Sequence, residues 1–332
     1  MQSKKIVLIS PALEAANNGN WHTAHRWAGF VKTDCDIEVL QKWSSSVTEN
    51  HEVAPHAMLA LHARRSAPSI QAWVKAHPGR PLVVVLTGTD LYRDIQSDAS
   101  AQLSLTLASH LVVLQDAGMD VLPAKFRPKA RVIYQSAIAL SPAVKSTRRF
   151  KAVMVGHLRD EKDPLTFIDA SALPQTVRVF FDQIGDGLDA SLVAAARAAA
   201  ERNPRFRWLG GLPRAETRQR IKRAHVLVNT SIMEGGAHVI LEAVQSGTPV
   251  LASRVSGNVG MLGADYLGFF EVGDSQQLAM LLQRCATSPE FLAVLQSQCQ
   301  HRAALFAPAT ERRLVLKLVN DIFAPSTTKV TP

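Results

Sequence analysis

Two glutamates and a pair of glycines mark the segment of the chain best suited to chemistry. In the stretch TSIMEGGAHVILEAVQSGTPV, Glu234 directly precedes Gly235 and Gly236, and Glu242 follows eight positions after Glu234. A β-rich run, HVLVNTS, comes before this turn and a helical run comes after it. The backbone N–H groups from Gly235 to Ala237 are therefore expected to lie unpaired at a helix N-terminus, where they can bind phosphate.

The two carboxylates need a different role from the glycines. Helical side chains lean toward the N-terminus, so Glu242 is expected to reach back toward the cavity that Glu234 faces, with His238 one turn before it on the same face. Carboxylates beside a diphosphate are best used to accept hydrogen bonds from hydroxyl groups on either side of it. A nucleoside diphosphate sugar offers this pattern, with ribose on one flank and the sugar on the other. Glutamates at such positions also occur without a function, so the interpretation depends on the whole strand, turn and helix.

The elements that must position these residues alternate along the chain. Short runs rich in Val, Ile and Leu, such as KIVLIS and PLVVVLTG, are separated by stretches of helical periodicity, one of them from about Gly19 to Val31. This pattern is typical of parallel sheets that helices bury on both faces. The stretch 137–150 has no periodicity and is interpreted as a linker between two domains.

The expected fold class is therefore α/β, with two doubly wound Rossmann-like domains that face a central cleft. We expect these domains at residues 1–140 and 150–305. Residues 306–332 are expected to form a C-terminal helix and tail that return toward the first domain. The carboxyl ends of the strands should line the cleft and carry the ligand site.

The composition bounds the function classes. Hydrophobic residues make up 47% and charged residues 20%, and the formal net charge is +9. No run approaches the roughly 18 apolar residues of a membrane span, so no stable membrane insertion is expected. A basic surplus can serve nucleic acid, an anionic surface or phosphorylated substrates. The densest cluster, RAETRQRIKRAH, has no aromatic residue and is interpreted as a solvated helix face, so nucleic acid is not an expected partner.

The N-terminus and the cysteines indicate a cytoplasmic protein. The apolar run from Ile6 to Ile9 is shorter than the usual signal-peptide core of about 7–15 residues and predicts a first strand instead. Cys35, Cys285 and Cys299 match no metal-ligand spacing and no disulfide framework, so ordinary thiols are expected.

With the GTPVLAS run that follows it, the glutamate segment resembles the E-x7-E motif of glycosyltransferase family 4, whose members have the GT-B fold. The likeness extends through VGHLRDEKDP, FRWLGGLP and SGNVGMLGADYLGFFEVGD. In that family the first glutamate contacts the hydroxyls of the donor sugar and the second binds the ribose. The resemblance gives these roles to Glu234 and Glu242, and it makes the 150–305 domain the nucleotide-sugar-binding one.

The same family neutralises the donor diphosphate with a strand-end arginine and a lysine five positions later. Lys162 matches the lysine, whereas His157 holds the arginine slot and Arg159 follows two places on. The resemblance implies Lys162 and Arg159 as phosphate ligands, and His157 is either a donor ligand or a structural strand-end histidine. Gly210 and Leu212 lie where the family binds uracil through its backbone, although two glycines there also suit a tight turn. Two cations make a metal unnecessary, so no metal or cofactor is expected.

The N-terminal half is similar to a narrower family, the selenosugar synthases of selenoneine biosynthesis. The runs NNGNWHTAHRWAGF, LHARRSAPSI and VVVLTGTDLYRD carry this resemblance. In that family a sugar passes from UDP-N-acetylglucosamine to the selenium of selenophosphate, and UDP is released. The resemblance implies UDP-N-acetylglucosamine or UDP-glucose as donor, selenophosphate as acceptor, and a functional link to selenophosphate synthase and the selenoneine-forming oxygenase. It also places Gly19 and Asn20 in a loop near the donor phosphates.

A cationic and hydroxyl-rich group of side chains follows two adjacent strands of the 1–140 domain and suits a small phosphate-like acceptor. Its members are His62, Arg64, Arg65, Thr87, Thr89 and Tyr92. An arginine pair favours multidentate contact with phosphate oxygens, although Arg64 and Arg65 can also begin a solvated helix.

Glu234, His62 and Asp90 are the candidate catalytic residues. Selenium in selenophosphate is already anionic and needs little help from a general base. Asp90 is the candidate for such a base, but it can instead cap its turn or orient Arg93.

Three alternatives stay open. The first is a GT-B transferase with another acceptor, such as a lipid, which would call for an amphipathic docking segment that is not evident. The second is a UDP-sugar epimerase of the same architecture, which would need no acceptor. The third is a non-catalytic protein that binds a sugar nucleotide or an anion.

Overall fold

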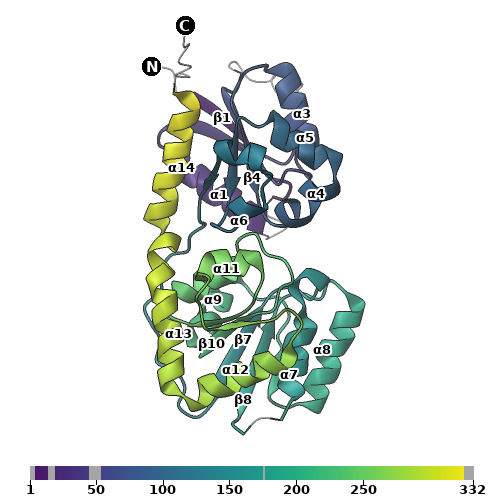
Figure 1. The fold of residues 1–332 in the computed structure, drawn as a ribbon, viewed down its shortest axis with the longest axis vertical. Coiled ribbons are helices and arrows are strands. Elements are labelled where there is room, and N and C mark those ends of the chain that lie inside the picture. Colours follow the sequence, from purple (N-terminus) through teal and green to yellow (C-terminus); the bar gives the residue numbers. More distant parts are fainter. Residues whose placement is uncertain (1–3, 14–18, 45–53, 175, 325–332) are drawn as a thin grey trace. The chain divides into compact units, whose positions relative to one another are not determined.

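The computed structural model describes residues 4–13, 19–44, 54–174 and 176–324. The chain divides into two compact units, which we call unit 1 (residues 1–135 and 309–332) and unit 2 (residues 136–308). Within the described residues each unit contains a sheet of six parallel strands with helices on its faces (Figure 1). The predicted α/β class with two doubly wound domains is therefore confirmed.

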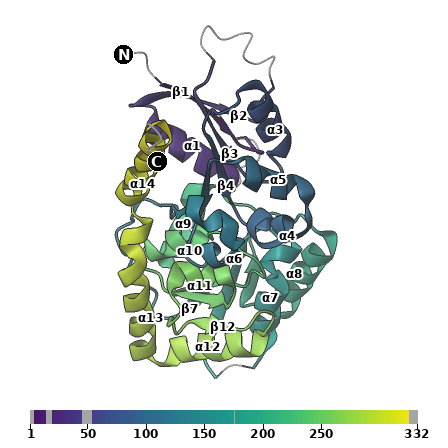
Figure 2. The same cartoon turned by 45° about the horizontal axis from the view of Figure 1, so that its top comes forward.

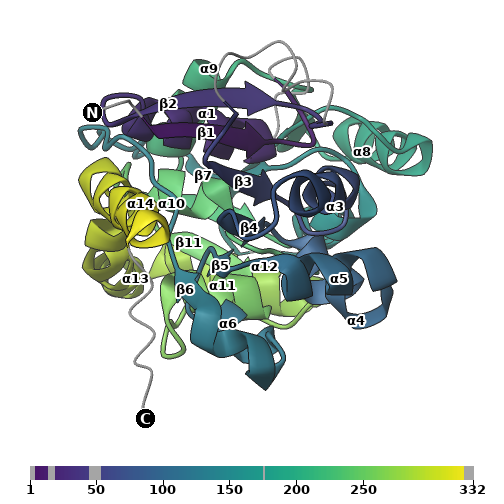
Figure 3. The ribbon, with the colours of Figure 1, turned by 90° about the horizontal axis from the view of Figure 1, so that it is seen from above.

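The sheet of unit 1 has the order β2-β1-β3-β4-β5-β6, which Figure 3 shows from above. The strand order reverses between β1 and β3, which pair in parallel although β2 lies between them in the sequence. In doubly wound sheets ligands bind outside the carboxyl ends of the strands at such a switch point. The strands are β1 (Lys4–Ile9), β2 (Cys35–Leu40), β3 (Ala57–Leu61), β4 (Leu82–Leu86), β5 (His110–Val113) and β6 (Ala130–Val132).

The helices of unit 1 include a single π-helical turn, η2, directly after β4. Such turns are rare and occur often at functional sites. The helices are α1 (Gly19–Val31), α3 (Ala67–Ala76), η2 (Asp90–Asp94), α4 (Ile95–Ser97), α5 (Ala99–Leu107), α6 (Gly118–Val121), η3 (Ala124–Lys129) and, from Ala309 onward, α14 (Pro308–Phe323).

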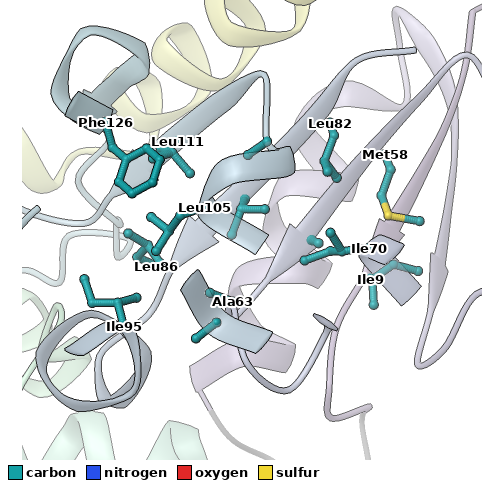
Figure 4. Packing of buried hydrophobic residues seen from close by; sticks show 14 of the residues in the cluster. Ile9, Met58, Ala63, Ile70, Leu82, Leu86, Ile95, Leu105, Leu111 and Phe126 are labelled. Atoms are coloured by element: carbon teal, nitrogen blue, oxygen red, sulfur yellow. The ribbon is translucent and has the colours of Figure 1, made fainter. Parts of the chain in front are cut away.

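Strand side chains alternate between two hydrophobic clusters, one on each face of the unit 1 sheet. Ile9 packs with residues of α3 and α5, such as Ile70 and Leu105, in the cluster that Figure 4 shows. Leu8 faces the other way and packs with α1 and α14. Because both faces are covered, the strands consist of continuous apolar runs.

The C-terminal helix α14 is part of the core of unit 1. Its residues Val315, Leu318 and Val319 are buried in the same cluster as Trp27 of α1, and the two helices lie alongside one another in Figures 1 and 2. The helix therefore returns to the first unit, as the sequence predicts.

The sheet of unit 2 has the order β12-β11-β10-β7-β8-β9, so its switch point lies between β7 and β10. Its strands are β7 (Phe150–Val155), β8 (Val179–Ile184), β9 (Phe206–Trp208), β10 (Val226–Asn229), β11 (Val250–Ser253) and β12 (Phe269–Phe270). Its helices are η4 (Asp160–Lys162), α7 (Pro164–Ala172), α8 (Ala190–Arg202), α9 (Arg214–Arg223), α10 (His238–Val244), α11 (Ser256–Leu262), α12 (Ser275–Thr287), α13 (Pro289–Arg302) and η5 (Ala303–Phe306).

The stretch interpreted as a linker is fixed to unit 2. It has no helix or strand before β7, but the backbone N–H of Leu140 donates to the Gln245 carbonyl at 2.9 Å. The half-buried Lys145 donates to the carbonyls of Lys222 and Ala224, both at 2.6 Å, at the C-terminal end of α9. These carbonyls lack partners inside the helix, so the lysine supplies one.

Glu311 of α14 forms the buried polar contact that joins this helix to α1. It is fully buried, and it accepts hydrogen bonds from Arg26 Nε at 2.6 Å and from Trp27 Nε1 at 2.8 Å. Removing one partner of a buried ion pair leaves an uncompensated charge, which costs about 3–5 kcal/mol. Glu311→Ala should therefore lower the free energy of unfolding of unit 1 by about that amount, measured by urea unfolding followed by tryptophan fluorescence.

The matched control is the solvent-accessible ion pair between Arg131 of β6 and Asp321 of α14, whose Nη1 and Oδ2 atoms are 2.7 Å apart. Exposed pairs contribute at most about 1 kcal/mol, so Asp321→Ala should have little effect. Equal losses in the two variants would contradict the role given to Glu311.

Candidate functional site

A buried ion pair spans the switch point of unit 2. Lys162 follows β7 and Glu234 follows β10, and these two strands are neighbours in the sheet. The Lys162 ammonium donates to Glu234 Oε1, which also accepts a hydrogen bond from Ser231 Oγ at 2.7 Å. The sequence places the two residues 72 positions apart, and only the strand order brings them into contact.

The loops that carry this pair are tied to each other. Thr230 Oγ1 donates to the Lys162 carbonyl at 2.7 Å, and the Ile232 N–H donates to the Glu161 carbonyl at 3.1 Å. Two glycines allow the close packing. A Cβ on Gly156 would lie 3.3 Å from the Lys162 side chain, and one on Gly257 would lie 1.8 Å from the Glu234 carbonyl oxygen.

The surroundings keep Glu234 ionised. Burial by itself raises the pKa of the Glu234 carboxyl. The adjacent Lys162 ammonium and the side-chain hydrogen bonds from Lys162, Ser231 and Asn229 outweigh burial, so the pKa lies below its ordinary value. The carboxylate is therefore a hydrogen-bond acceptor at neutral pH and not a proton donor.

Glu242 lies on α10 and meets an arginine of α9. Arg214 donates through Nη2 to Glu242 Oε1 at 3.1 Å, and His238 Nδ1 lies 4.0 Å from the same oxygen. The Glu242 side chain is nearly buried, whereas that of Arg214 is 44% exposed. Arg218, one turn further along α9, donates to the Ile138 carbonyl. The sequence predicts a solvated face for this basic helix, but Arg214 and Arg218 bind Glu242 and the Ile138 carbonyl of the same unit.

His157 and Arg159 follow β7 but are held differently. His157 Nδ1 accepts the N–H of Asp186 at 3.1 Å, and burial lowers the pKa of its imidazole, with the nearby Asp186 carboxylate opposing. Arg159 is exposed and lies 3.9 Å from Glu161. His157 is thus fixed as a neutral ring against the β8 loop, whereas the Arg159 guanidinium remains at the surface.

The glycines of the predicted base-binding loop have a structural reason. Gly210 has a φ of +67°, a left-handed conformation that favours glycine, and its carbonyl accepts the Gly185 N–H at 2.8 Å. A Cβ on Gly211 would lie 2.1 Å from Asp186 Oδ1. Leu212 is half-buried. The backbone conformation explains the glycine at 210, and the close approach of Asp186 explains the one at 211. The contact of this loop with a base stays a prediction.

At the N-terminus of α10, one of the backbone N–H groups predicted to be unpaired has a partner. α10 begins at His238, after Gly235 and Gly236. The Ala237 N–H is not free for a ligand, since it donates to the Met261 sulfur at 3.0 Å. The expectation of an unpaired N–H at Ala237 is therefore wrong, because α11 packs its methionine against the turn.

In unit 1, a buried histidine with an unusual backbone follows β3. His62 has a φ of +72°, which costs strain in a residue that is not glycine. The Arg65 N–H donates to His62 Nδ1 at 3.3 Å, so in the neutral ring Nε2 carries the proton and donates to Thr89 Oγ1 at 3.0 Å. The Thr89 hydroxyl is left with its own proton to donate, which suits an anionic oxygen.

His62 is not one of the cations of this group. Burial lowers the pKa of its imidazole, although the carboxylates of Asp90 and Asp94 act to raise it. The side chain is 2% exposed. The histidine therefore orients Thr89 as a neutral donor, and the positive charge of the group comes from arginine.

Asp90 holds the turn after β4. It is fully buried, and its carboxylate accepts the N–H groups of Ala63, Thr87 and Gly88, each at 2.9 Å. A carboxylate engaged with three backbone donors is poorly placed to take a proton from a substrate. Of the roles left open for Asp90, the geometry favours the cap of the turn.

The remaining predicted acceptor residues lie around this turn. Arg64 donates to Asp94 Oδ2 at 2.8 Å, whereas Arg65 is exposed and forms no ion pair with the rest of the described chain. Tyr92 OH accepts from Gln115 Nε2 at 2.6 Å. Gly19 and Asn20 begin α1 itself, and residues 14–18 of the predicted glycine loop lie outside the described residues.

Several residues of the two sites escaped prediction from the sequence. Ser231, Asp94 and Arg214 contact the predicted residues directly. Arg214 and Arg218 did carry a signal, since they share one helical face directly after the FRWLGGLP motif. Ser231 and Asp94 carried none, because their partners are set by tertiary packing. No group of three or more His, Cys, Asp or Glu within the described ranges is placed to hold a metal ion.

Two doubly wound units with polar groups at their strand ends define a class of α/β proteins whose ligands bind at the switch points. Residues 140–302 match the protein-family profile described as Glycosyl transferases group 1. None of the helices described is long and apolar enough to cross a membrane.

Curated relatives match over part of their length. A stretch of 185 residues is 26% identical to the "Glycosyltransferase 1 domain-containing protein 1" of Xenopus tropicalis, over 55% of this chain and 52% of that protein. A stretch of 162 residues is 28% identical to the UDP-Gal:alpha-D-GlcNAc-diphosphoundecaprenol alpha-1,3-galactosyltransferase of Escherichia coli. The match covers 46% of this chain and 40% of that protein. The chain thus spans about half the length of the curated relatives it matches, or less.

Solved structures resemble nearly the whole chain. HepE of Anabaena, solved with UDP and glucose, superposes with a TM-score of 0.73 at 18% identity, over 96% of this chain and 100% of that one. The sucrose-phosphate synthase of Thermosynechococcus elongatus gives a TM-score of 0.80 at 15% identity, over 96% of this chain and 99% of that one. At these identities the likeness shows the fold, which is GT-B.

The neutral state of buried His62 gives a pH dependence. Its pKa is lowered in the folded state, so the unfolded chain binds an extra proton between that folded pKa and the ordinary 6.5. The free energy of unfolding should therefore fall as the pH drops through this window and level off above it. His62→Gln should flatten this slope, measured by urea unfolding between pH 5 and pH 8.

The same change at His301, exposed on α13, is the control. Other buried histidines keep part of the slope in every variant, so the comparison is between the two variants. A His62→Gln slope equal to that of His301→Gln would show that folding does not lower the pKa of His62.

Proposed function

We propose that this chain is a UDP-sugar-dependent glycosyltransferase. It transfers a sugar from UDP-N-acetylglucosamine or UDP-glucose to the selenium of selenophosphate, releases UDP and forms a selenosugar for selenoneine biosynthesis. Selenophosphate synthase would supply its acceptor, and the selenoneine-forming oxygenase would consume a product derived from it. The activity requires no metal or cofactor, and it takes place in the cytoplasm.

The observation that carries the donor half is the Lys162–Glu234 pair at the switch point of the group 1 domain. Lys162 supplies the cation for the donor diphosphate, and Glu242 of α10 supplies an acceptor for the ribose hydroxyls. UDP is present in the solved structures of HepE and of the pneumococcal O-GlcNAc transferase GtfA, and UDP-Gal is part of the name of the Escherichia coli relative. These names support a UDP-sugar as the donor.

The proposed reaction exchanges one bond at the anomeric carbon of the sugar. An electron pair of the selenium forms the new carbon–selenium bond, and the bond from that carbon to the UDP oxygen breaks with its electron pair on UDP. The Lys162 ammonium stabilises the negative charge that develops on the leaving diphosphate. Glu234 contacts the sugar hydroxyls while the bond loosens, so its contribution is largest in the transition state.

The acceptor half rests on the polar turn of unit 1. His62 holds the Thr89 hydroxyl as a donor, and Arg65 and Arg64 supply positive charge beside it. Hydroxyl and guanidinium donors suit the oxygens of a phosphate group and disfavour a lipid tail. The selenium is already anionic, so Asp90 is not needed as a base, which agrees with its use in the turn.

The release of UDP measured with and without selenophosphate tests this function. We expect UDP to appear only when both UDP-N-acetylglucosamine, or UDP-glucose, and selenophosphate are present. Equal UDP release without an acceptor would indicate an epimerase or a hydrolase. Binding of UDP without turnover under either condition would indicate a binding protein, and turnover with a different acceptor would overturn the selenophosphate assignment alone.

Donor affinity should depend on Glu242 and Lys162. Loss of a hydrogen-bond partner that carries charge costs roughly 1.5–3 kcal/mol, about ten- to a hundredfold in affinity. Glu242→Ala and Lys162→Ala should each weaken UDP binding by that factor in calorimetry. The control is Glu216→Ala on α9, an exposed glutamate paired with Arg220, which should bind UDP as the parent does. Normal UDP affinity in Glu242→Ala would rule out its ribose contact.

Acceptor affinity should depend on the arginine pair of unit 1. Replacement of Arg64 and Arg65 by alanine should raise the KM for selenophosphate by about tenfold, with UDP affinity near normal. Inorganic phosphate, which would use the same cations, should inhibit the variant more weakly. Arg93→Ala removes an exposed arginine that contacts the same Asp94 and is the control. An unchanged KM in the double variant would place the acceptor elsewhere, for example near His238 and Asn258.

A further inference from the structure

A chain of buried polar side chains in unit 2 leads to Glu234 and has no role in the function described so far. It begins in α11, passes the end of β11 and reaches the loop after β10. Its members are Asn258, Ser253, Ser231 and Asn229, and each of them is at most 4% exposed. Buried polar groups are costly unless they are satisfied, so a chain of this kind needs a reason.

The hydrogen bonds of this chain fix Ser231 from both sides. The Ser231 N–H donates to Asn229 Oδ1 at 3.0 Å, and the Ser231 carbonyl accepts from Ser253 Oγ at 2.5 Å. With both backbone groups held, its hydroxyl is left to donate to Glu234 Oε1 at 2.7 Å. The orientation of this hydroxyl is therefore set by the protein and not by solvent.

Asn258 holds the far end of the chain. Its Nδ2 donates to the Ser253 carbonyl at 2.9 Å and to Ser253 Oγ at 3.1 Å, which directs the Ser253 hydroxyl toward Ser231. Its Oδ1 is buried and has no hydrogen-bond partner within the described chain. An unpaired buried acceptor destabilises the fold. The contribution of this amide to the chain therefore comes from its two donated hydrogen bonds.

Backbone contact reinforces the same connection. Gly257 precedes Asn258 in α11, and a Cβ there would lie 1.8 Å from the Glu234 carbonyl and 3.0 Å from its Cβ. α11 thus meets the Glu234 turn at two successive residues, once through van der Waals contact and once through the polar chain. The position of Glu234 is defined by α11 as well as by its own loop.

We propose that Ser231, held by the Asn258–Ser253 chain, is a positioning residue that fixes the Glu234 carboxylate for sugar transfer. The inference deepens the proposed function and rests on the role given there to Glu234. Lys162 can leave Glu234 when a diphosphate takes its ammonium, because both would compete for the same charge. The Ser231 hydroxyl is uncharged and is not drawn away by a diphosphate, and its backbone is held by Asn229 and Ser253, so we expect it to keep the carboxylate in place when the donor is bound.

The first test separates positioning from folding. Ser231→Ala should lower kcat by about tenfold, the equivalent of one lost hydrogen bond of about 1.4 kcal/mol, with UDP affinity within about twofold of the parent. Ser231→Thr keeps the hydroxyl and should restore most of the activity. The control is Ser171→Ala, which removes a buried serine of α7 whose Oγ donates to the Ile168 carbonyl at 2.6 Å. A parental kcat in Ser231→Ala, or equal losses of kcat and UDP affinity, would overturn the proposal.

The second test does not require turnover, so it distinguishes a failure of this proposal from a failure of the proposed function. The Glu234 carboxyl is titrated in the full chain by carbon-13 NMR of labelled glutamate, with Glu234→Gln to identify its signal. The charged group in contact with Glu234 is Lys162 of η4, while His238 and Glu242 of α10 lie near one another. These groups are unchanged in the variants, so a change in the titration reports on the polar chain.

Removal of the Ser231 hydroxyl should raise the pKa of the Glu234 carboxyl, because one of its lowering hydrogen bonds is lost. Asn258→Ala should raise it as well, although Asn258 does not touch Glu234. Ser253→Ala removes the middle of the chain and should act in the same direction if Asn258→Ala proves unstable. An unchanged Glu234 titration in both Asn258→Ala and Ser253→Ala would show that the chain only holds the fold.

Discussion

The largely buried ion pair between Lys162 and Glu234 is the interaction on which the arrangement of the candidate site in unit 2 depends. A buried pair costs desolvation free energy that two well-packed apolar residues would not, so it contributes little to stability as such. Here the two loops around it are bound to each other through Thr230 and Ile232, and glycines at 156 and 257 give the pair room. The pair places an ammonium group and a carboxylate at the point where the strand order reverses.

That position follows from the parallel sheet. Its strands all present their carboxyl ends at one edge, and the two loops at the switch point leave in opposite directions. Groups after β7 and β10 therefore meet there, while β8 and β9, which precede Asp186 and Arg214, both lie on the β7 side of the sheet. A cation and acceptors in one place are what a sugar nucleotide requires. The neighbouring Glu242 and Arg214 extend the polar edge along α9 and α10.

Unit 1 uses the same kind of sheet edge with a different electrostatic design. Its carboxylates are directed inward, where Asp90 binds backbone N–H groups and Asp94 binds Arg64. Its histidine is neutral and serves to direct a hydroxyl. The hydrogen-bond donors are therefore available to an anion, while the negative charges are used within the protein. The strained φ of His62 and the π-helical turn after Thr89 are local irregularities of the kind that often mark functional sites.

The sequence by itself determined the elements and the fold class. Apolar runs at regular intervals predicted the parallel strands, and α1 from Gly19 to Val31 lies where its periodicity indicated. The E-x7-E segment was recognisable because a strand, a turn and a helix follow one another within a short stretch, whereas Lys162 was identified through the resemblance of its segment to a family motif. Local patterns of this kind depend on neighbours in the chain, which the sequence shows directly.

The tertiary structure decided which groups are paired, because those contacts join residues far apart in the chain. Glu234 meets Lys162 only because β10 lies beside β7, and Glu311 meets Arg26 only because α14 packs on α1. It also decided that Asp90 binds the backbone, that His62 is neutral and that the Ala237 N–H meets Met261. Burial and hydrogen bonding set the charge and the orientation of a side chain, and both are properties of the packed chain.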